Sequence, residues 1–149
     1  LSGGWGHRLG DEASGYWIGR SVLSKSWAAW DGVGPSSALT QAVLHRFNNC
    51  PAEIVTFAQT HPPEDIAALA PIVTGATGDA VADHILSDGA THIAGTLETL
   101  GWTAKTPLCL LGGVAECYRP YLPDQVHRMI APAQGSALDG ALRLARAMP

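Results

Sequence analysis

Small and apolar residues recur every four positions between residues 81 and 97. The set is Val81, Ile85, Gly89, Ile93 and Leu97, and Leu100 closes the same face. Since residues four apart lie above one another on a helix, this spacing predicts an amphipathic helix that packs through one side. It is the clearest helical pattern in the chain.

A second helix is predicted from Asp11 to about Trp30, because aspartate is a good N-cap and acidic side chains suit a helix start. Its large side chains Tyr16, Leu23, Trp27 and Trp30 are spaced by seven, four and three residues. This spacing places them on one face of the helix. A glycine- and proline-rich stretch at residues 31–35 ends it.

The remaining pattern is mostly helical. Helices are expected from Ser36 to Phe47, from Pro62 through Val73 and over residues 137–147, whereas residues 50–59 suit either a short helix or a strand. Residues 107–111 form a short, fully apolar run that is typical of a buried parallel strand. So little strand beside so much helix is easier to understand in part of an α/β domain than in a complete one.

Composition and charge narrow the class of protein. The chain has 149 residues, of which 46% are hydrophobic and 15% charged, and its net charge is −4. This is enough apolar material for one compact domain, and the acidic balance argues against a nucleic-acid surface. The longest apolar run, residues 66–73, is far shorter than the roughly 20 residues that cross a bilayer. We therefore expect neither a nucleic-acid nor a membrane partner.

The three cysteines, Cys50, Cys109 and Cys117, form no CxxC pair. Neither a disulfide scaffold nor a zinc knuckle is indicated, and a reducing cytoplasm is the simplest compartment. The chain opens without a methionine, within what looks like a glycine-rich motif. We therefore interpret it as a piece of a longer protein.

Residues 3–19 carry the strongest chemical signal. Six of these seventeen residues are glycine, which lets backbone approach a ligand closely. Trp5 offers a flat apolar face on which a sugar ring could stack, and the Asp11 carboxylate can accept two hydrogen bonds from neighbouring hydroxyls. The alternative is purely structural, with Asp11 as a helix cap, Trp5 in the core and the glycines in turns.

The order GGWG, GDE, SG and WIG within this stretch resembles the signature of the N-acetylglucosamine kinase family. That family is part of the BadF/BadG/BcrA/BcrD ATPase group, in the superfamily of sugar kinases, actin and chaperone ATPases. Weaker points of resemblance are the Gly-Asp pair at residues 78–79, the turn at residues 110–113 and the motif at residues 138–141. The resemblance therefore covers the whole chain, although only its first motif is highly specific.

The resemblance implies roles for five residues. Trp5 and Asp11 would line the amino-sugar site, Gly112 and Gly113 would belong to the adenosine-binding region, and Ala76 would contact the nucleotide. Taken without the family, a strand followed by two glycines is more often a tight turn, and the corner at Ala76 is a helix cap. Both interpretations stay open at this point.

The family's first phosphate loop and its catalytic aspartate lie N-terminal to the matched segment. We therefore assign no catalytic residue and no metal ligand in this chain, although the resemblance implies ATP and Mg²⁺ as cofactors. His84, Asp88 and His92 share a helix face at metal-like spacing, but no fourth ligand is evident. A solvated helix face is the better interpretation of these three side chains.

The expected fold is therefore α/β: the ribonuclease-H-like C-terminal lobe of an actin-like ATPase, helix-rich with a small sheet. Residues 1–149 would form this lobe and face an absent N-terminal lobe. The implied function is ATP-dependent phosphorylation of N-acetylglucosamine or glucosamine at the 6-hydroxyl. A BadF-type ATPase that activates a partner enzyme, or a ligand-free helical interaction domain, remains as an alternative. The expected partners are the amino sugar, ATP and the protein's own N-terminal lobe, and a homodimer is left open.

Overall fold

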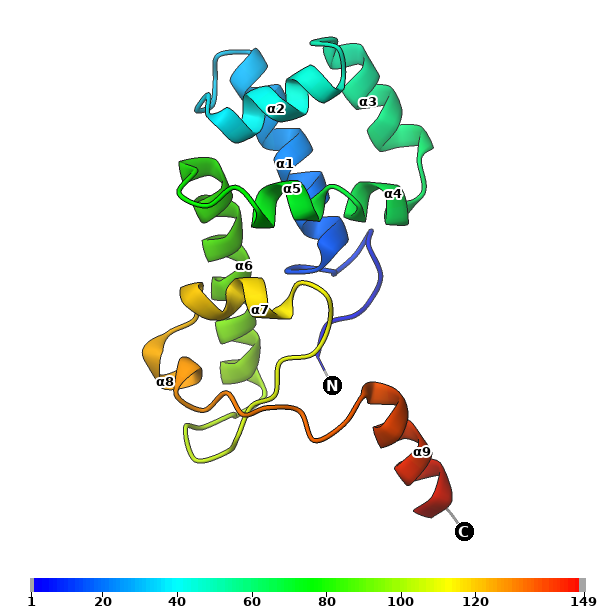
Figure 1. Cartoon of the computed structure of the whole chain (residues 1–149), viewed down its shortest axis with the longest axis vertical. Coiled ribbons are helices and arrows are strands. Elements are labelled where there is room, and N and C mark those ends of the chain that lie inside the picture. Colours follow the sequence, from blue (N-terminus) through cyan, green and yellow to red (C-terminus); the bar gives the residue numbers. More distant parts are fainter. Residues whose placement is uncertain (1, 148–149) are drawn as a thin grey trace.

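The computed structural model describes residues 2–147, and its regular elements are helices (Figure 1). They are α1 (Gly15–Trp30), α2 (Ala38–Arg46), α3 (Pro51–Thr60), α4 (Pro63–Ala67), α5 (Ala70–Thr74), α6 (Ala80–Thr99), α7 (Ala115–Tyr118), a 3-10 turn (Arg119–Tyr121), α8 (Asp124–His127) and α9 (Ala137–Ala147). None of the helices within residues 2–147 is long and apolar enough to cross a membrane.

Two long helices organise the packing. Helix α1 contacts α2, α3, α4, α5 and α6, whereas α7 and the 3-10 turn pack against α6. Figure 1 shows α1 to α5 gathered at one end of the molecule and α7 and α8 beside the lower half of α6, while α9 extends away from the rest. Buried apolar residues form one cluster shared by both long helices, including Ile18, Val22, Ile85 and Tyr118.

The expected small sheet is wrong for the part of the chain that the structure describes, which contains no strand. Residues 107–111 are extended, but they pair only through an isolated parallel bridge between Leu108 and Ile130. The N–H of Leu108 donates to the Met129 carbonyl and the N–H of Ala131 donates to the Leu108 carbonyl, both at 2.8 Å. Leu111 is 60% exposed rather than buried. A parallel strand needs neighbours along its length, and residues 2–147 supply one short partner only.

Helix α1 begins four residues later than predicted. Its N-cap is Ser14, whose Oγ accepts a hydrogen bond from the N–H of Trp17 at 3.0 Å. Ala13 has a φ of +65°, a left-handed conformation that cannot continue a right-handed helix towards Asp11. Asp11 is therefore in a turn before the helix, where its carbonyl accepts from the N–H of Ser14 at 3.0 Å.

The large side chains of α1 do not share one buried face. The buried side is formed by Ile18, Val22 and Leu23, whereas Trp27 is 36% and Trp30 49% exposed. This difference arises because α1 packs most extensively against α2 and α4, on the Ile18 side. The face with Tyr16 and Trp27 borders an open groove instead.

The other predicted helices are confirmed with two changes. Helix α6 buries Val81 and Ile85 as expected, but Leu100 is 53% exposed. The helix expected through Val73 is split into α4 and α5, because Pro71 has no N–H to donate and its ring disfavours a continuous turn. Residues 50–59, which had remained ambiguous, are almost all in α3.

Candidate functional site

The N-terminal loop (residues 3–14) forms a tight turn before α1. The N–H groups of Leu9 and Gly10 both donate to the Gly6 carbonyl at 3.0 Å, and the N–H of Trp5 donates to the Gly10 carbonyl at 3.2 Å. Gly6 has a φ of +90°, which a residue with a Cβ rarely adopts. The turn therefore holds the backbone of Trp5 beside Gly10, the residue that precedes Asp11.

The structural interpretation of Trp5 as a core residue is wrong. Its side chain is 79% exposed. The indole ring of Trp5 lies next to Gly10 without pressing on it. A Cβ atom built on Gly10 would be 3.8 Å from Trp5 Cδ1, an ordinary van der Waals distance. A large aromatic face is thus presented to solvent by a rigid turn, which is unusual for a residue of this size.

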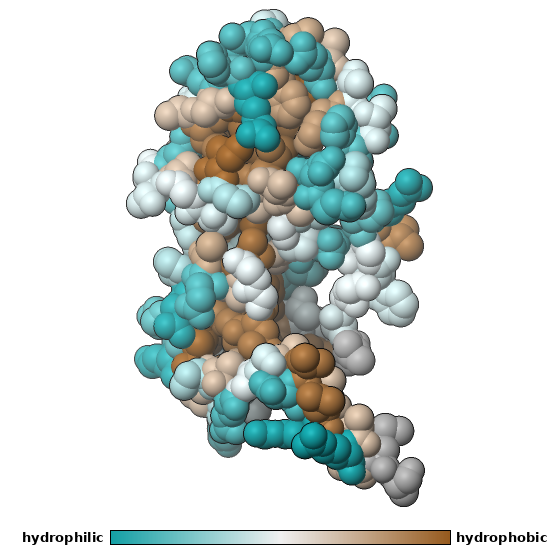
Figure 2. All heavy atoms as spheres, turned by 45° about the vertical axis from the view of Figure 1, so that its right-hand side comes forward, coloured by the Kyte–Doolittle hydropathy of each residue, from teal (hydrophilic) through white to brown (hydrophobic). Residues whose placement is uncertain are grey.

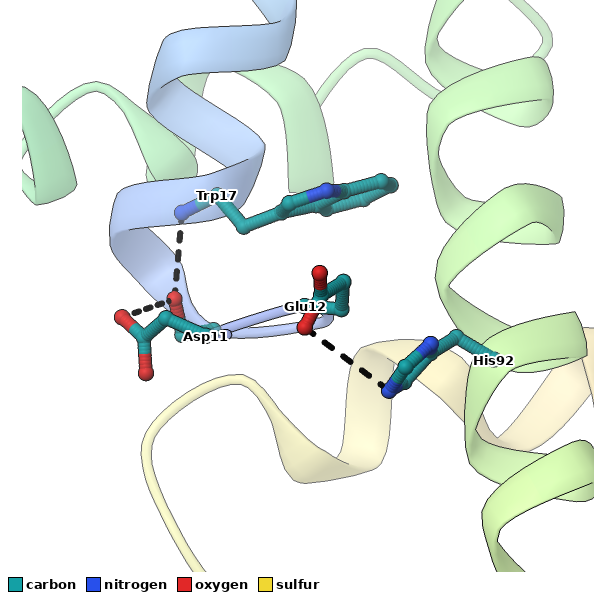
Figure 3. A network of polar contacts seen from close by, with 5 residues as sticks. Asp11, Glu12, Trp17 and His92 are labelled. Atoms are coloured by element: carbon teal, nitrogen blue, oxygen red, sulfur yellow. Dashed lines mark hydrogen bonds and ion pairs between the residues drawn. The ribbon is translucent and has the colours of Figure 1, made fainter. Parts of the chain in front are cut away.

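Asp11 is not the N-cap of α1, but its carboxylate accepts a hydrogen bond from Ser14, which is the N-cap. Its Oδ2 accepts a hydrogen bond from Ser14 Oγ at 2.7 Å, and that Oγ in turn accepts from the Trp17 N–H (Figure 3). Among residues 2–147, Oδ1 of Asp11 has no hydrogen-bond partner. One oxygen of a half-buried carboxylate is therefore oriented by the protein while the other is free to accept hydrogen bonds from a ligand.

A cavity of about 220 Å³ lies between the N-terminal loop and α6. Its wall on the loop side includes Gly10, Asp11 and Glu12, and its wall on the helix side includes Ile93 and Leu97. The cavity therefore combines carboxylates on one side with apolar side chains on the other, a combination that suits a small polar ligand with an apolar face.

Glu12 and His92 connect these two walls. Oε2 of Glu12 lies 3.9 Å from Nε2 of His92, as Figure 3 shows. The prediction placed His92 on a solvated helix face, and its side chain is indeed 46% exposed. The contact with Glu12 was missed because the two residues are eighty positions apart, and no local spacing in the sequence links them.

The three residues expected at the nucleotide lie elsewhere. Ala76 is half-buried in the turn between α5 and α6 and packs against the core. Gly112, with a φ of +112°, and Gly113 are exposed before α7, and a Cβ on either would meet open space. None of the three lines the cavity at Asp11. Trp5 does not line this cavity either, so of the five predicted residues the structure places only Asp11 there, with Trp5 on the same loop.

The histidines of α6 do not form a metal centre with each other. Nε2 of His84 lies 3.4 Å from Oδ2 of Asp88, one turn along, whereas His92 contacts Glu12. Within residues 2–147, no three His, Cys, Asp or Glu side chains are grouped so that they could hold a metal ion.

Comparison with known proteins adds independent information. The chain is 29% identical over 145 residues to a glucosamine kinase of Vibrio cholerae and 35% identical over 127 residues to an N-acetyl-D-glucosamine kinase of Dictyostelium discoideum. These matches cover 96% and 77% of the chain. It is also 28% identical to an N-acetylmuramic acid/N-acetylglucosamine kinase of Clostridium acetobutylicum, over 139 residues and 87% of the chain.

The three-dimensional comparison agrees with the sequence matches. The crystal structure of a candidate N-acetylglucosamine kinase from Chromobacterium violaceum superposes with a TM-score of 0.86 and 32% identity, over 96% of this chain. The chain is related to the amino-sugar kinases. The expected resemblance is therefore confirmed, although no family profile matches the chain.

The matches also set the extent of the relationship. The chain spans 49%, 40% and 45% of the three amino-sugar kinases and 50% of the Chromobacterium violaceum chain. A match to about half of each amino-sugar kinase fits the C-terminal portion that the motifs indicated.

Proposed function

We propose that this chain is the C-terminal lobe of a cytoplasmic, ATP-dependent amino-sugar kinase, which phosphorylates N-acetylglucosamine or glucosamine at the 6-hydroxyl. The names of the related proteins support an amino-sugar substrate. They also favour a kinase over an ATPase that activates a partner enzyme. All three cysteines are free, in keeping with a reducing compartment.

The oriented Asp11 in the cavity wall, with the exposed Trp5 on the same loop, is the observation that carries the proposal. A tryptophan face gives a pyranose ring an apolar platform, and a carboxylate accepts charge-assisted hydrogen bonds from two adjacent hydroxyls. Ser14 fixes one oxygen of Asp11, so little side-chain entropy is lost when a sugar binds. Neither residue has a structural role that requires its exposure.

In the proposed mechanism the residues of this chain bind and orient. Asp11 and Trp5 hold the sugar ring, which positions a hydroxyl for in-line transfer. When bound, ATP would supply the phosphoryl group and Mg²⁺ would neutralise its charge. The catalytic base would come from the N-terminal lobe, because the family that the chain resembles carries its catalytic aspartate N-terminal to the matched segment.

The turn at Gly112 and Gly113 fits a nucleotide better than Ala76 does. A Cβ on either glycine would point into open space, so the surface there can be approached closely. We place the adenosine against these two glycines. A contact from Ala76 would be a smaller one, because its side chain is half-buried and packs on the core.

Uncovered apolar surface supports the assignment as one lobe of a larger protein. Leu111 is 60% exposed on the extended segment, and no residue of α9 is buried. Leu138 and Leu144 of α9 are 68% and 71% exposed. Exposed apolar surface of this kind usually marks a place where another domain or another protein binds. The related kinases are about twice as long as this chain.

The test is the substitution Asp11→Asn in the longer kinase, that is, the full two-lobe protein of which we propose this chain is the C-terminal lobe. The change keeps the shape of the side chain and removes its charge, so kcat/KM for the sugar should fall about 10- to 150-fold, or roughly 1.5–3 kcal/mol. The KM for ATP should change less than about twofold. Asp31→Asn is the matched control, because Asp31 is exposed at the other end of α1.

A second variant separates binding from folding. Ser14→Ala removes the cap of α1 and should lower the melting temperature while Asp11 keeps its charge. If Asp11→Asn lowers the melting temperature as Ser14→Ala does, yet leaves the sugar kinetics unchanged, the proposed sugar-binding role of Asp11 is wrong.

A further inference from the structure

A groove separates α1 from α3 and α4, and none of its lining residues lines the cavity at Asp11. Two adjoining cavities form it, of about 330 Å³ and 440 Å³, and they share Tyr16, Ala58 and Ile66. Figure 2 shows an apolar hollow bordered by hydrophilic residues at this end of the molecule. We call the whole feature the α1–α3 groove.

The two halves of the α1–α3 groove differ in chemistry. The first half is lined mainly by apolar side chains, among them Leu23, Trp27, Ile54 and Val55. Trp27 is 36% and Val55 40% exposed, so apolar surface remains open to solvent there. Tyr16, Leu23 and Trp27, three of the four residues whose spacing the sequence made conspicuous, line this half, and of these Leu23 is buried whereas Trp27 stays partly exposed.

The second half is polar and basic. His7 and Arg8 of the N-terminal loop line it together with His61, which follows α3. Arg20 projects from α1 into the lining of the apolar half. Neither half is lined by an aspartate or glutamate, and neither Arg8 nor Arg20 belongs to an ion pair within the described residues. Arg8 and Arg20 are thus the two positive charges of the groove, one in each half, in a chain whose net charge is −4.

The groove is also elongated. Its lining on α1 runs from Tyr16 to Trp27, eleven residues and therefore about 16 Å along the helix axis. An occupant that matches both halves is long, apolar over most of its length and negatively charged at the end nearest Arg8. Charge-assisted hydrogen bonds to an arginine suit a carboxylate.

We propose that the α1–α3 groove binds an amphiphilic anion of the acyl carboxylate class. The apolar chain lies along Leu23, Trp27 and Ile54, and the carboxylate meets Arg8 at the basic end. Such a ligand covers the exposed Trp27 and Val55, which supplies the hydrophobic part of the binding free energy. The site shares none of the residues proposed to bind the sugar or ATP.

The test is calorimetric titration of the chain with decanoate below its micellar concentration. One molecule should bind per chain, at least tenfold more tightly than decyltrimethylammonium, which has the same chain length and the opposite charge. Acetate, which has the charge without the chain, should show no measurable binding. Equal affinity for decanoate and decyltrimethylammonium would overturn the proposal, because the basic half would then contribute nothing.

Variants locate the site. Ala58→Glu places a carboxylate at the junction of the two halves, at an exposed position where the fold should tolerate it, and should weaken decanoate binding at least tenfold. Ala52→Glu makes the same change at another exposed position of α3, outside the groove lining, and should alter the affinity less than twofold. The double variant Arg8→Gln with Arg20→Gln should weaken binding about tenfold, whereas Arg46→Gln, exposed on α2, should not.

The remaining outcomes are equally decisive. Circular dichroism establishes that each variant keeps its helices. Unchanged decanoate binding by a folded Ala58→Glu chain would place the ligand elsewhere and reject the proposal. The mass in solution tests the alternative occupant, a second copy of the chain. A dimer that Ala58→Glu dissociates, with no decanoate binding to the parent chain, would also reject it.

Discussion

Ala13 has a backbone conformation that L-amino acids seldom adopt, at the point where the N-terminal loop becomes α1. Its φ of +65° turns the chain between Asp11 and the cap residue Ser14. That turn lets Ser14 Oγ donate to Asp11 while accepting from the helix. The geometry of the candidate site therefore depends on a locally strained residue.

Ala13→Gly should stabilise the chain. A left-handed L-residue costs about 1–2 kcal/mol, and the extra entropy of unfolded glycine costs about 0.5–1 kcal/mol, so the net gain is roughly 0.5–1 kcal/mol. The melting temperature should rise by about 1–4 °C. Ala42→Gly, at an exposed position inside α2, is the control and should lower it. A fall of similar size in both variants would contradict the strain at Ala13.

At this scale the sequence is informative about local structure. Trp5 and Asp11 are candidates because glycines, an aromatic ring and a carboxylate occur within a few positions of each other, and their binding roles stay a prediction. The hydrogen bond from Ser14 to Asp11 spans only three residues, although the cap itself was assigned to the wrong one. The contact of Glu12 with His92 depends on how α1 and α6 pack, so no sequence spacing could reveal it.

At the scale of elements, the crossing of α1 and α4 depends on Gly19. A Cβ built there would collide with the Ile66 carbonyl oxygen and lie 2.8 Å from its carbonyl carbon. Because the obstacle is backbone, it cannot move aside as a flexible side chain would. The two helices can approach this closely only with glycine at that position.

Gly19→Ala should therefore destabilise the chain by about 2 kcal/mol or more, despite the better helix propensity of alanine. Gly95→Ala is the matched control, because Gly95 is also helical and a Cβ there meets nothing within 4 Å. That variant should gain up to about 1 kcal/mol. Urea unfolding measures both. A similar increase in the free energy of unfolding in both variants would show that α1 and α4 leave room for a Cβ at position 19.

Asp79 joins two other elements through its carboxylate. Oδ1 accepts from the N–H groups of Val81 and Ala82 at the start of α6, and Oδ2 accepts from the N–H of Leu39 in α2 at 2.9 Å. Desolvation by burial raises the pKa of Asp79, but hydrogen bonds from these N–H groups and from the Ser37 hydroxyl outweigh it, so the pKa lies below its ordinary value of 3.8. The ionised form is thus the one that the fold favours.

A lowered pKa in the folded state gives stability that is present above pH 3.8 and is lost as the pH falls through the folded-state value. Asp79→Ala should cost about 1–2 kcal/mol at pH 7, the usual loss of a helix cap. The difference in the free energy of unfolding between the parent chain and Asp79→Ala, measured with urea, should become smaller as the pH is lowered from 5 towards 2.5. A difference that stays constant over this range would show that the charge of Asp79 contributes nothing to stability.

Elements defined by their own periodicity and caps were predicted well, as α2 and α6 show. The errors occurred where tertiary context decides. The aromatic spacing of α1 indicated a single face, but Trp27 borders the α1–α3 groove instead of the core. The apolar run before Gly112 indicated a buried strand, but a strand exists only with partners, and residues 2–147 supply one bridge. These segments have the composition of a core without the neighbours that would bury them.

At the scale of the whole molecule, α9 borders only a shallow cavity beside Cys109 and Leu111 and buries none of its own residues within the described part of the chain. Leu138, Leu142 and Leu144 are 68%, 47% and 71% exposed. An isolated helix of eleven residues is marginal in water. Leu138 and Leu142 are one turn apart and form an apolar row, whereas Arg143 lies on a different side of α9, so this row is suited to contact a surface that residues 2–147 do not provide.

The proposed two-lobe kinase makes a prediction about this side. Leu142→Gln should leave the melting temperature of the 149-residue chain unchanged, because the chain does not bury Leu142, but should destabilise the longer kinase by about 1.5–3 kcal/mol, the value of a buried leucine. Arg143→Gln, at an exposed position on a different side of α9 from Leu138 and Leu142, should change the melting temperature of neither protein. The chain alone should show no sugar-dependent release of ADP, because it supplies only part of the site. Sugar-dependent turnover by the chain alone, or equal melting of the longer kinase with and without Leu142→Gln, would contradict the assignment of residues 1–149 as one lobe.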